Sequence, residues 1–152
     1  MALFHTVFDM QKLKRLFYYF LVIIILLSAV SVAMVELFNR SDLAFMKGVS
    51  NSWILFVFLF AIAYTQGQIS KKGLADLRRF NDSEGLFDKY LRYYKGFFLN
   101  CLPIVTTCAL FVLTYKNLFF YLLLIEVLFS FAFFPRQAQI LKELPDRDIT
   151  FD

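Results

Sequence analysis

The chain has few of the residue types from which small enzymes build active sites. Its 152 residues include one histidine, two cysteines, five glycines and three prolines. His5 is the single histidine, so neither a Ser-His-Asp triad nor a histidine-based metal cluster is indicated. A glycine-rich phosphate-binding loop is also missing from the sequence. We therefore predict a protein that is not an enzyme and that uses no cofactor and no metal.

The two cysteines do not predict a disulfide. Cys101 and Cys108 lie seven residues apart in one apolar run, and on a helix this spacing separates them by two turns, or ~10 Å. A disulfide requires Cα atoms closer than ~7 Å. We interpret both cysteines as small, buried residues.

Charge is scarce and avoids the long apolar runs. Charged residues make up 18% of the chain and apolar residues 60%, including 21 phenylalanines, which is more than a small soluble core can bury. The net charge is +4, but lysine and arginine flank the apolar runs and alternate with acids. This distribution is typical of membrane topology and not of a nucleic-acid-binding surface. The composition predicts one membrane domain over residues 1–152, with lipids among its partners and no nucleic acid.

Four apolar runs predict an all-α, integral membrane fold. A transmembrane helix needs about 20 residues to cross a hydrocarbon core of about 30 Å. The runs come close to this length and contain almost no charge. The four predicted spans are Leu16–Phe38, Trp53–Gln68, Phe97–Tyr115 and Leu118–Phe134.

The segment between the second and third spans keeps a helical period. Its apolar residues recur every three or four positions, with a break near 81–83. We predict that residues 69–95 form a helical hairpin that extends these two spans out of the membrane. Its apolar stripe would then offer a docking surface, with four residues as the candidates: Leu77, Phe80, Leu86 and Phe87.

The positions of lysine and arginine predict the orientation. Thirteen of them lie in the N-terminal segment, in residues 70–95 and after Phe134, whereas three lie in the two remaining connections. Positive residues accumulate on the cytoplasmic side of a membrane. Both termini and the hairpin are therefore predicted to be cytoplasmic, in an inner or plasma membrane.

Glu126 is the residue whose predicted location is energetically costly. It lies at the middle of the fourth span, where an unpartnered charge costs at least about 2.5–3.5 kcal/mol. The carboxyl should be neutral, paired, or turned towards protein. Polar residues at similar depth are its candidate neighbours: Ser130, Asn100, Thr106, Thr107, Ser28 and Ser31.

Small residues and a proline indicate where helices could approach closely. Ala29 and Ala33 form one small-x3-small pair, and Ala63 and Gly67 form another. Pro103 is predicted to kink the third span, with Asn100 or Thr107 bonding to the backbone groups that the kink frees.

These features leave three functional hypotheses. The first is a non-enzymatic subunit, accessory protein or scaffold of a membrane complex, with other membrane subunits or further copies of itself as partners. The second is a small oligomeric, proton-coupled transporter or channel that uses Glu126. The third is an immunity-type membrane protein that binds a toxin. We favour the first, because a transport path usually needs more than one ionisable group.

Overall fold

The computed structural model describes residues 6–37, 52–80, 85–99, 102–114, 116–145 and 147–152, and these ranges are mostly helical. The described residues form six α-helices, a short 3-10 helix and two strands. The α-helices are α1 (Met10–Leu37), α3 (Ser52–Arg78), α4 (Leu86–Leu99), α5 (Leu102–Thr114), α6 (Asn117–Ser130) and α7 (Gln137–Glu143). The 3-10 helix η1 is Phe131–Phe133, and the strands are β1 (Thr6–Phe8) and β2 (Ile149–Phe151).

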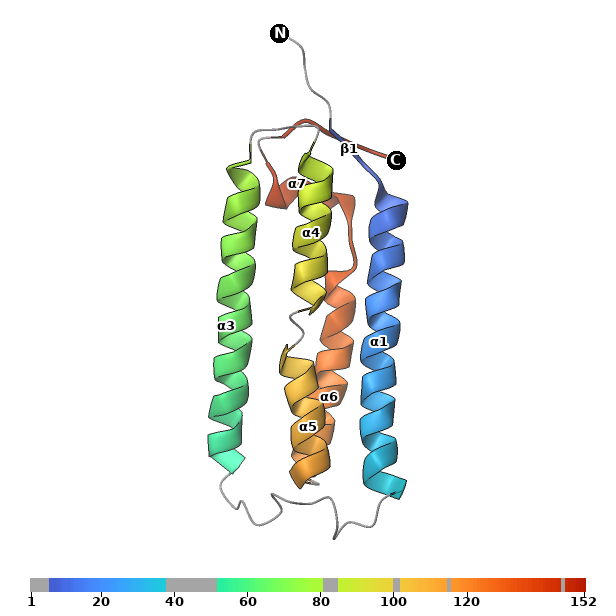
Figure 1. Ribbon diagram of the computed structural model, residues 1–152, viewed down its shortest axis with the longest axis vertical. Helices are drawn as coiled ribbons and strands as arrows, with labels where there is room; N and C mark the ends of the chain where they lie inside the picture. The colour runs from blue at the N-terminus through green and yellow to red at the C-terminus, as the bar shows by residue number, and fades with distance from the viewer. Residues whose placement is uncertain (1–5, 38–51, 81–84, 100–101, 115, 146) are drawn as a thin grey trace.

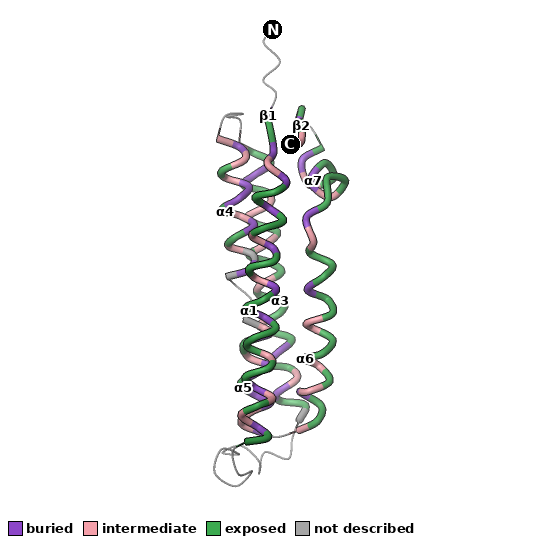
Figure 2. The backbone as a smooth tube through the Cα atoms, turned by 90° about the vertical axis from the view of Figure 1, so that its right-hand side faces the viewer, coloured by how far each residue is buried: buried purple, intermediate pink, exposed green. Residues whose placement is uncertain are grey.

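The helices form a long, narrow bundle. α1 and α3 flank a central column in which α4 and α5 follow each other along the long axis (Figure 1). α6 lies on one side of this layer, as the perpendicular view shows (Figure 2). The two strands and α7 lie together at one end of the bundle, which we call the strand end (Figure 1).

α1 packs through one narrow stripe. Asp9 caps its first turn, since Asp9 Oδ1 accepts a hydrogen bond of 2.8 Å from the Lys12 backbone N–H. Its buried residues recur every three, four or seven positions, which keeps them on one side of the helix. They are Met10, Leu13, Phe17, Leu21, Ile24, Ser31 and Val35. The other sides of α1 expose large apolar residues, as a lipid-facing helix does.

Two helices are long and apolar enough to cross a membrane, namely α1 and α3 from Trp53 to Arg78. A third candidate is the pair formed by α6 with η1 and by α7, which bends by 83° between its two parts. These findings agree with the predicted membrane protein. They do not by themselves establish four spans.

The third predicted span is covered by two described helices. α4 ends at Leu99 and α5 begins at Leu102. Residues 100 and 101 lie outside the described residues, so the expected kink at Pro103 stays a prediction. Pro103 occupies the first turn of α5. A backbone N–H at this position would have no partner within the helix, so proline, which lacks the N–H, costs no hydrogen bond here. α5 has 13 residues, which corresponds to only about 20 Å. It is too short to cross a bilayer alone.

α3 is continuous through Gln68 to Arg78, so the helical period after the second apolar run does correspond to helix. The predicted turn at 81–83 lies outside the described residues. That α3 and α4 leave the membrane together as a hairpin stays a prediction.

The chain also has a small sheet, which an all-α prediction does not include. β1 and β2 pair in parallel, with Thr6 opposite Ile149 and Phe8 opposite Phe151. The Asp152 N–H donates to the Phe8 oxygen, and the Met10 N–H donates to the Asp152 oxygen, each at 3.1 Å. The polar C-terminal segment is thereby fixed beside β1.

A hydrophobic cluster at the strand end, the terminal cluster, joins both ends of the chain to the central helices. Its most deeply buried members come from β1, α1, α3, α4, α7 and the residue that follows α7. They are Phe8, Leu13, Phe17, Leu77, Leu86, Ile140 and Leu144. Because segments far apart in sequence meet here, the cluster fixes how α7 and the strands lie on the bundle.

Candidate functional site

Glu126 bonds to the helix beside it. Thr107 Oγ1 on α5 donates a hydrogen bond of 3.0 Å to Glu126 Oε1, and Thr107 is fully buried. Ser130 Oγ donates to the backbone oxygen of Glu126 at 2.9 Å, one turn along α6. Glu126 Oε2 is buried and has no hydrogen-bond partner among the described residues. The carboxyl is therefore tied to α5 by one oxygen only.

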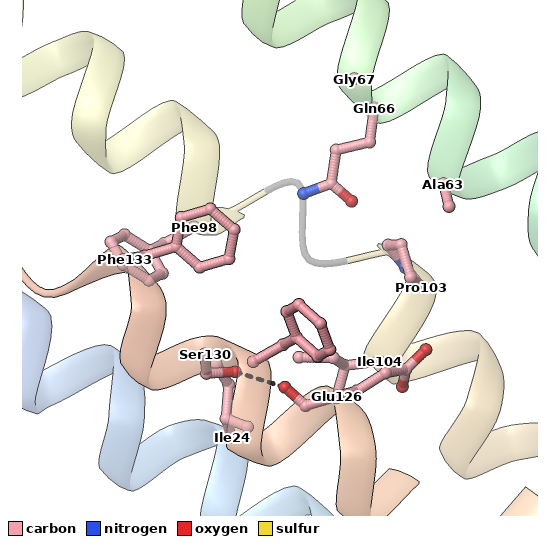
Figure 3. Close-up of a pocket in the computed structure, with 11 residues that line it drawn as sticks. Ile24, Ala63, Gln66, Gly67, Phe98, Pro103, Ile104, Glu126, Ser130 and Phe133 are labelled. Carbon is pink, nitrogen blue, oxygen red and sulfur yellow. Dashed lines mark hydrogen bonds between the residues drawn. The ribbon is translucent and has the colours of Figure 1, made fainter. Parts of the chain in front are cut away.

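A cavity of about 380 Å³ lies beside this carboxyl (Figure 3). α3 forms one wall and α6 another, and the junction of α4 and α5 closes the space between them. The lining is largely apolar, with Glu126, Gln66 and Ser130 as its polar members. The remaining lining residues are Ile24, Ala63, Gly67, Phe98, Pro103, Ile104, Phe129 and Phe133.

Two of the other predicted polar neighbours of Glu126, Ser28 and Ser31, bond within their own helix. Ser28 Oγ and Ser31 Oγ donate to the carbonyls four residues earlier on α1, at 2.9 and 2.8 Å. Thr106 is half-buried next to Thr107 and does not line the cavity. Asn100 lies outside the described residues. Thr107 and Ser130 are thus the neighbours that the fold brings to Glu126.

Among the described residues, the predicted small-residue pairs do not mediate close contacts. Ala29 and Ala33 are exposed on α1, and Ala63 is exposed on α3. A Cβ atom on Gly67 would meet nothing within 4 Å. A small-x3-small pattern indicates a helix face with small side chains, but it does not identify the segment that packs against this face. Close packing of these pairs against another chain stays a prediction.

The close helix approach in the described chain occurs instead at Gly73. A Cβ atom there would lie 3.0 Å from Cδ2 of Tyr93, so any larger residue would require the Tyr93 ring to shift away from α3. Gly73 stands in a charged segment, without a second small residue four positions away to form the expected motif. The sequence reading therefore missed it.

Two of the four predicted docking residues are buried and two are half-buried. Leu77 and Leu86 are each 1% exposed, and Phe80 and Phe87 pack against the terminal cluster. Leu77 and Leu86 are therefore not on an exposed surface, and docking of a partner at this stripe stays a prediction. An apolar stripe on a helix requires a cover, and the N-terminal segment and α7 of the same chain supply it.

A polar cluster at the strand end was not predicted. Tyr90 Oη donates to Glu143 Oε2 at 2.7 Å, and Gln139 Nε2 donates to Glu143 Oε1 at 3.0 Å. Tyr94 Oη donates to the Phe133 oxygen at 2.9 Å. Tyr90 and Glu143 are 53 residues apart in the sequence, and no local pattern joins them.

The described residues contain no group of three or more histidine, cysteine, aspartate or glutamate side chains that could hold a metal ion. No protein-family model, curated protein or solved structure matches this chain. The features of the fold that bear on function are therefore the cavity beside Glu126 and the polar cluster at the strand end.

Proposed function

We propose that this protein is a non-enzymatic, four-pass integral membrane protein that serves as a subunit or accessory protein of a membrane complex. α1 and α3 supply two passes. α4 and α5 follow each other along one axis and together supply the third, and α6 with η1 supplies the fourth. The charge distribution favours cytoplasmic termini.

The observation that supports a partner is the half-buried carboxyl of Glu126 on the wall of the α3–α6 cavity. A polar group at membrane depth is stabilised when it faces protein and finds a second hydrogen-bonding group. A transmembrane helix of another subunit, with a lysine, arginine or hydroxyl side chain at mid-depth, could both fill the apolar cavity and bond to this carboxyl.

α3 is also poorly covered by the described part of its own chain. In its most apolar stretch 11% of the residues are buried, compared with 22% in that of α1. Ala63 and Gly67 keep the helix surface narrow where the cavity opens. A partner helix could approach closely at this point, as small residues permit in membranes.

Photo-crosslinking tests this proposal. A photoreactive phenylalanine analogue at Gly67, on the cavity wall, should give one discrete adduct with another membrane protein in native membranes. The same analogue at Tyr64, which is 61% exposed on α3 but outside the cavity lining, is the matched control and should give mainly lipid adducts. The Gly67 adduct should persist with Glu126→Gln and be lost with Glu126→Leu.

Two results would contradict a heteromeric subunit. One is a Gly67 adduct at twice the chain mass of 17.9 kDa, which would indicate contact between copies of this chain. The other is an adduct that Glu126→Leu leaves unchanged, since the carboxyl would then have no part in the contact.

Proton-coupled transport is the second candidate, and one observation favours it. A smaller cavity at the strand end contains Glu143 and shares Phe133 with the cavity of Glu126. Two carboxyl groups thus lie on either side of one phenylalanine. Proton flux into proteoliposomes that the wild type supports, and that Glu126→Gln abolishes in an intact protein, would favour transport over the subunit proposal.

A further inference from the structure

The smaller cavity at the strand end is built from oxygen atoms and aromatic rings. It has a volume of about 150 Å³ and lies between α3, α4 and α7. The side chains of Tyr90, Tyr93 and Tyr94 enter its lining from α4, Ser70 from α3 and Glu143 from α7. This composition differs from the largely apolar cavity around Glu126.

The hydrogen-bond donors to the Glu143 carboxylate are neutral groups. Its two carboxylate oxygens accept hydrogen bonds from Tyr90 and Gln139, and no salt bridge to it is found within the described part of the chain. Arg78 lies nearby, but its Nε donates to the backbone oxygen of Glu143, at 2.8 Å. A half-buried carboxylate with only neutral donors is stabilised further by a cation in the adjoining space.

The rest of the lining suits an ammonium group. The hydroxyls of Tyr93 and Ser70 lie 3.2 Å apart, and each oxygen has lone pairs that can accept further hydrogen bonds. An alkylammonium group carries three N–H donors in a small volume. The tyrosine rings add the attraction between a cation and an aromatic face.

The position of the cavity favours a lipid as the source of this group. α7 lies at 83° to the axis of α6 and η1, so it runs along the membrane surface if α6 crosses the membrane. Ile140 and Leu144 are buried beneath it, and Arg136 is exposed where it begins. The cavity next to α7 then lies at headgroup depth, and the exposed Arg78 can contact a headgroup phosphate.

We propose that this cavity binds the primary ammonium group of an aminophospholipid headgroup, with Glu143 as its counter-ion. The Ser70 and Tyr93 hydroxyls complete the hydrogen bonding. This site is separate from the contact proposed at Glu126, so either proposal can fail without the other.

Native mass spectrometry of the full chain in mild detergent tests the site. Short-chain phosphatidylethanolamine and phosphatidylglycerol with identical acyl chains are compared. Wild type should bind phosphatidylethanolamine about tenfold more tightly, the effect expected of one charge-assisted hydrogen bond. Glu143→Gln should abolish this preference. Its amide oxygen can still accept from Tyr90, so the fold should persist.

Two further variants separate binding from folding. Tyr93→Phe removes one acceptor without touching α7 and should reduce the preference in part. Asp88→Asn, on an exposed position of α4, removes a carboxylate outside the cavity and should leave the preference intact. Unchanged preference in Glu143→Gln, or equal binding of both lipids by wild type, would overturn the site. Free ethanolamine competing as well as the lipid would overturn the headgroup assignment.

Discussion

Glu126 contacts a polar residue of another helix because of how the two helices pack. Glu126 meets Thr107 because α5 and α6 pack along each other with their polar positions at the same depth. The contact joins two otherwise apolar helices by a hydrogen bond. In a bilayer such bonds contribute modestly, because the separated helices also find polar partners.

Glu126→Gln should preserve this contact, since the amide oxygen can accept from Thr107 at nearly the same volume. Glu126→Leu should lower the free energy of unfolding by about 0.6–2 kcal/mol, the range for interhelical hydrogen bonds in membranes. Unfolding by a denaturing detergent, followed by helicity, measures the difference. Glu36→Leu, at an exposed position of α1, is the control. Equal losses from Glu126→Gln and Glu126→Leu would show that the hydrogen bond is not what stabilises this site.

At the scale of elements, α3 and α4 depend on one glycine for their contact. Gly73 on α3 lets the Tyr93 ring of α4 approach. The Tyr93 hydroxyl then forms a hydrogen bond with Ser70, which also lies on α3. A larger side chain at Gly73 must push the ring away. Gly67, six residues earlier, faces open space and offers a comparison within one helix.

Gly73→Val should lower the free energy of unfolding by about 1–3 kcal/mol, as overpacking does in other well-packed sites. Gly67→Val should change it little, because no atom lies within 4 Å of the added Cβ. Both variants are compared by thermal unfolding in detergent. Similar destabilisation by the two would indicate a backbone effect common to both glycines and would contradict the proposed contact with Tyr93.

The terminal strands are a second element with a measurable effect. β2 covers Phe8, which is fully buried against α4. Deletion of residues 149–152 removes the backbone bonds to β1 and should speed amide hydrogen exchange in α4 between 86 and 94. Thr150→Ala keeps those backbone bonds and should leave exchange unchanged. Unaltered exchange after the deletion would show that the sheet does not stabilise the terminal cluster.

At the scale of the whole molecule, the bundle has two chemically different ends. The strand end contains β1, β2, α7 and most lysines and arginines, while the opposite end contains the end of α5 and the start of α6. Such an asymmetry sets orientation during insertion. We therefore expect the two ends to lie on opposite sides of the membrane.

Cysteine labelling in a variant lacking Cys101 and Cys108 measures this orientation. Asp88→Cys, near the strand end, should react with an impermeant reagent only from the cytoplasmic side. Lys116→Cys, at the junction of α5 and α6, should react only from the opposite side. Reaction of both cysteines from one side would rule out the four-pass arrangement, because the third pass, proposed for α4 and α5, lies between residues 88 and 116.

The sequence alone determined the class of protein and much of its helical content. Long runs without charge leave few alternatives to membrane helices, since burying so much apolar surface in a small soluble core is impossible. The position of Glu126 at the middle of the fourth apolar run also followed from the sequence. Counting residues back across the short connection between α5 and α6 also indicated Thr107 as a neighbour of Glu126.

Only the tertiary structure decided which surfaces are covered and by what. Leu77 and Leu86 read as a docking stripe, yet residues from both ends of the chain bury them. The pairing of β1 with β2 and the contact of Tyr90 with Glu143 join segments separated by more than 50 residues. A periodic pattern reports that one face of a helix is apolar. It carries no information about the distant segment that packs there, because that choice depends on the closure of the whole chain.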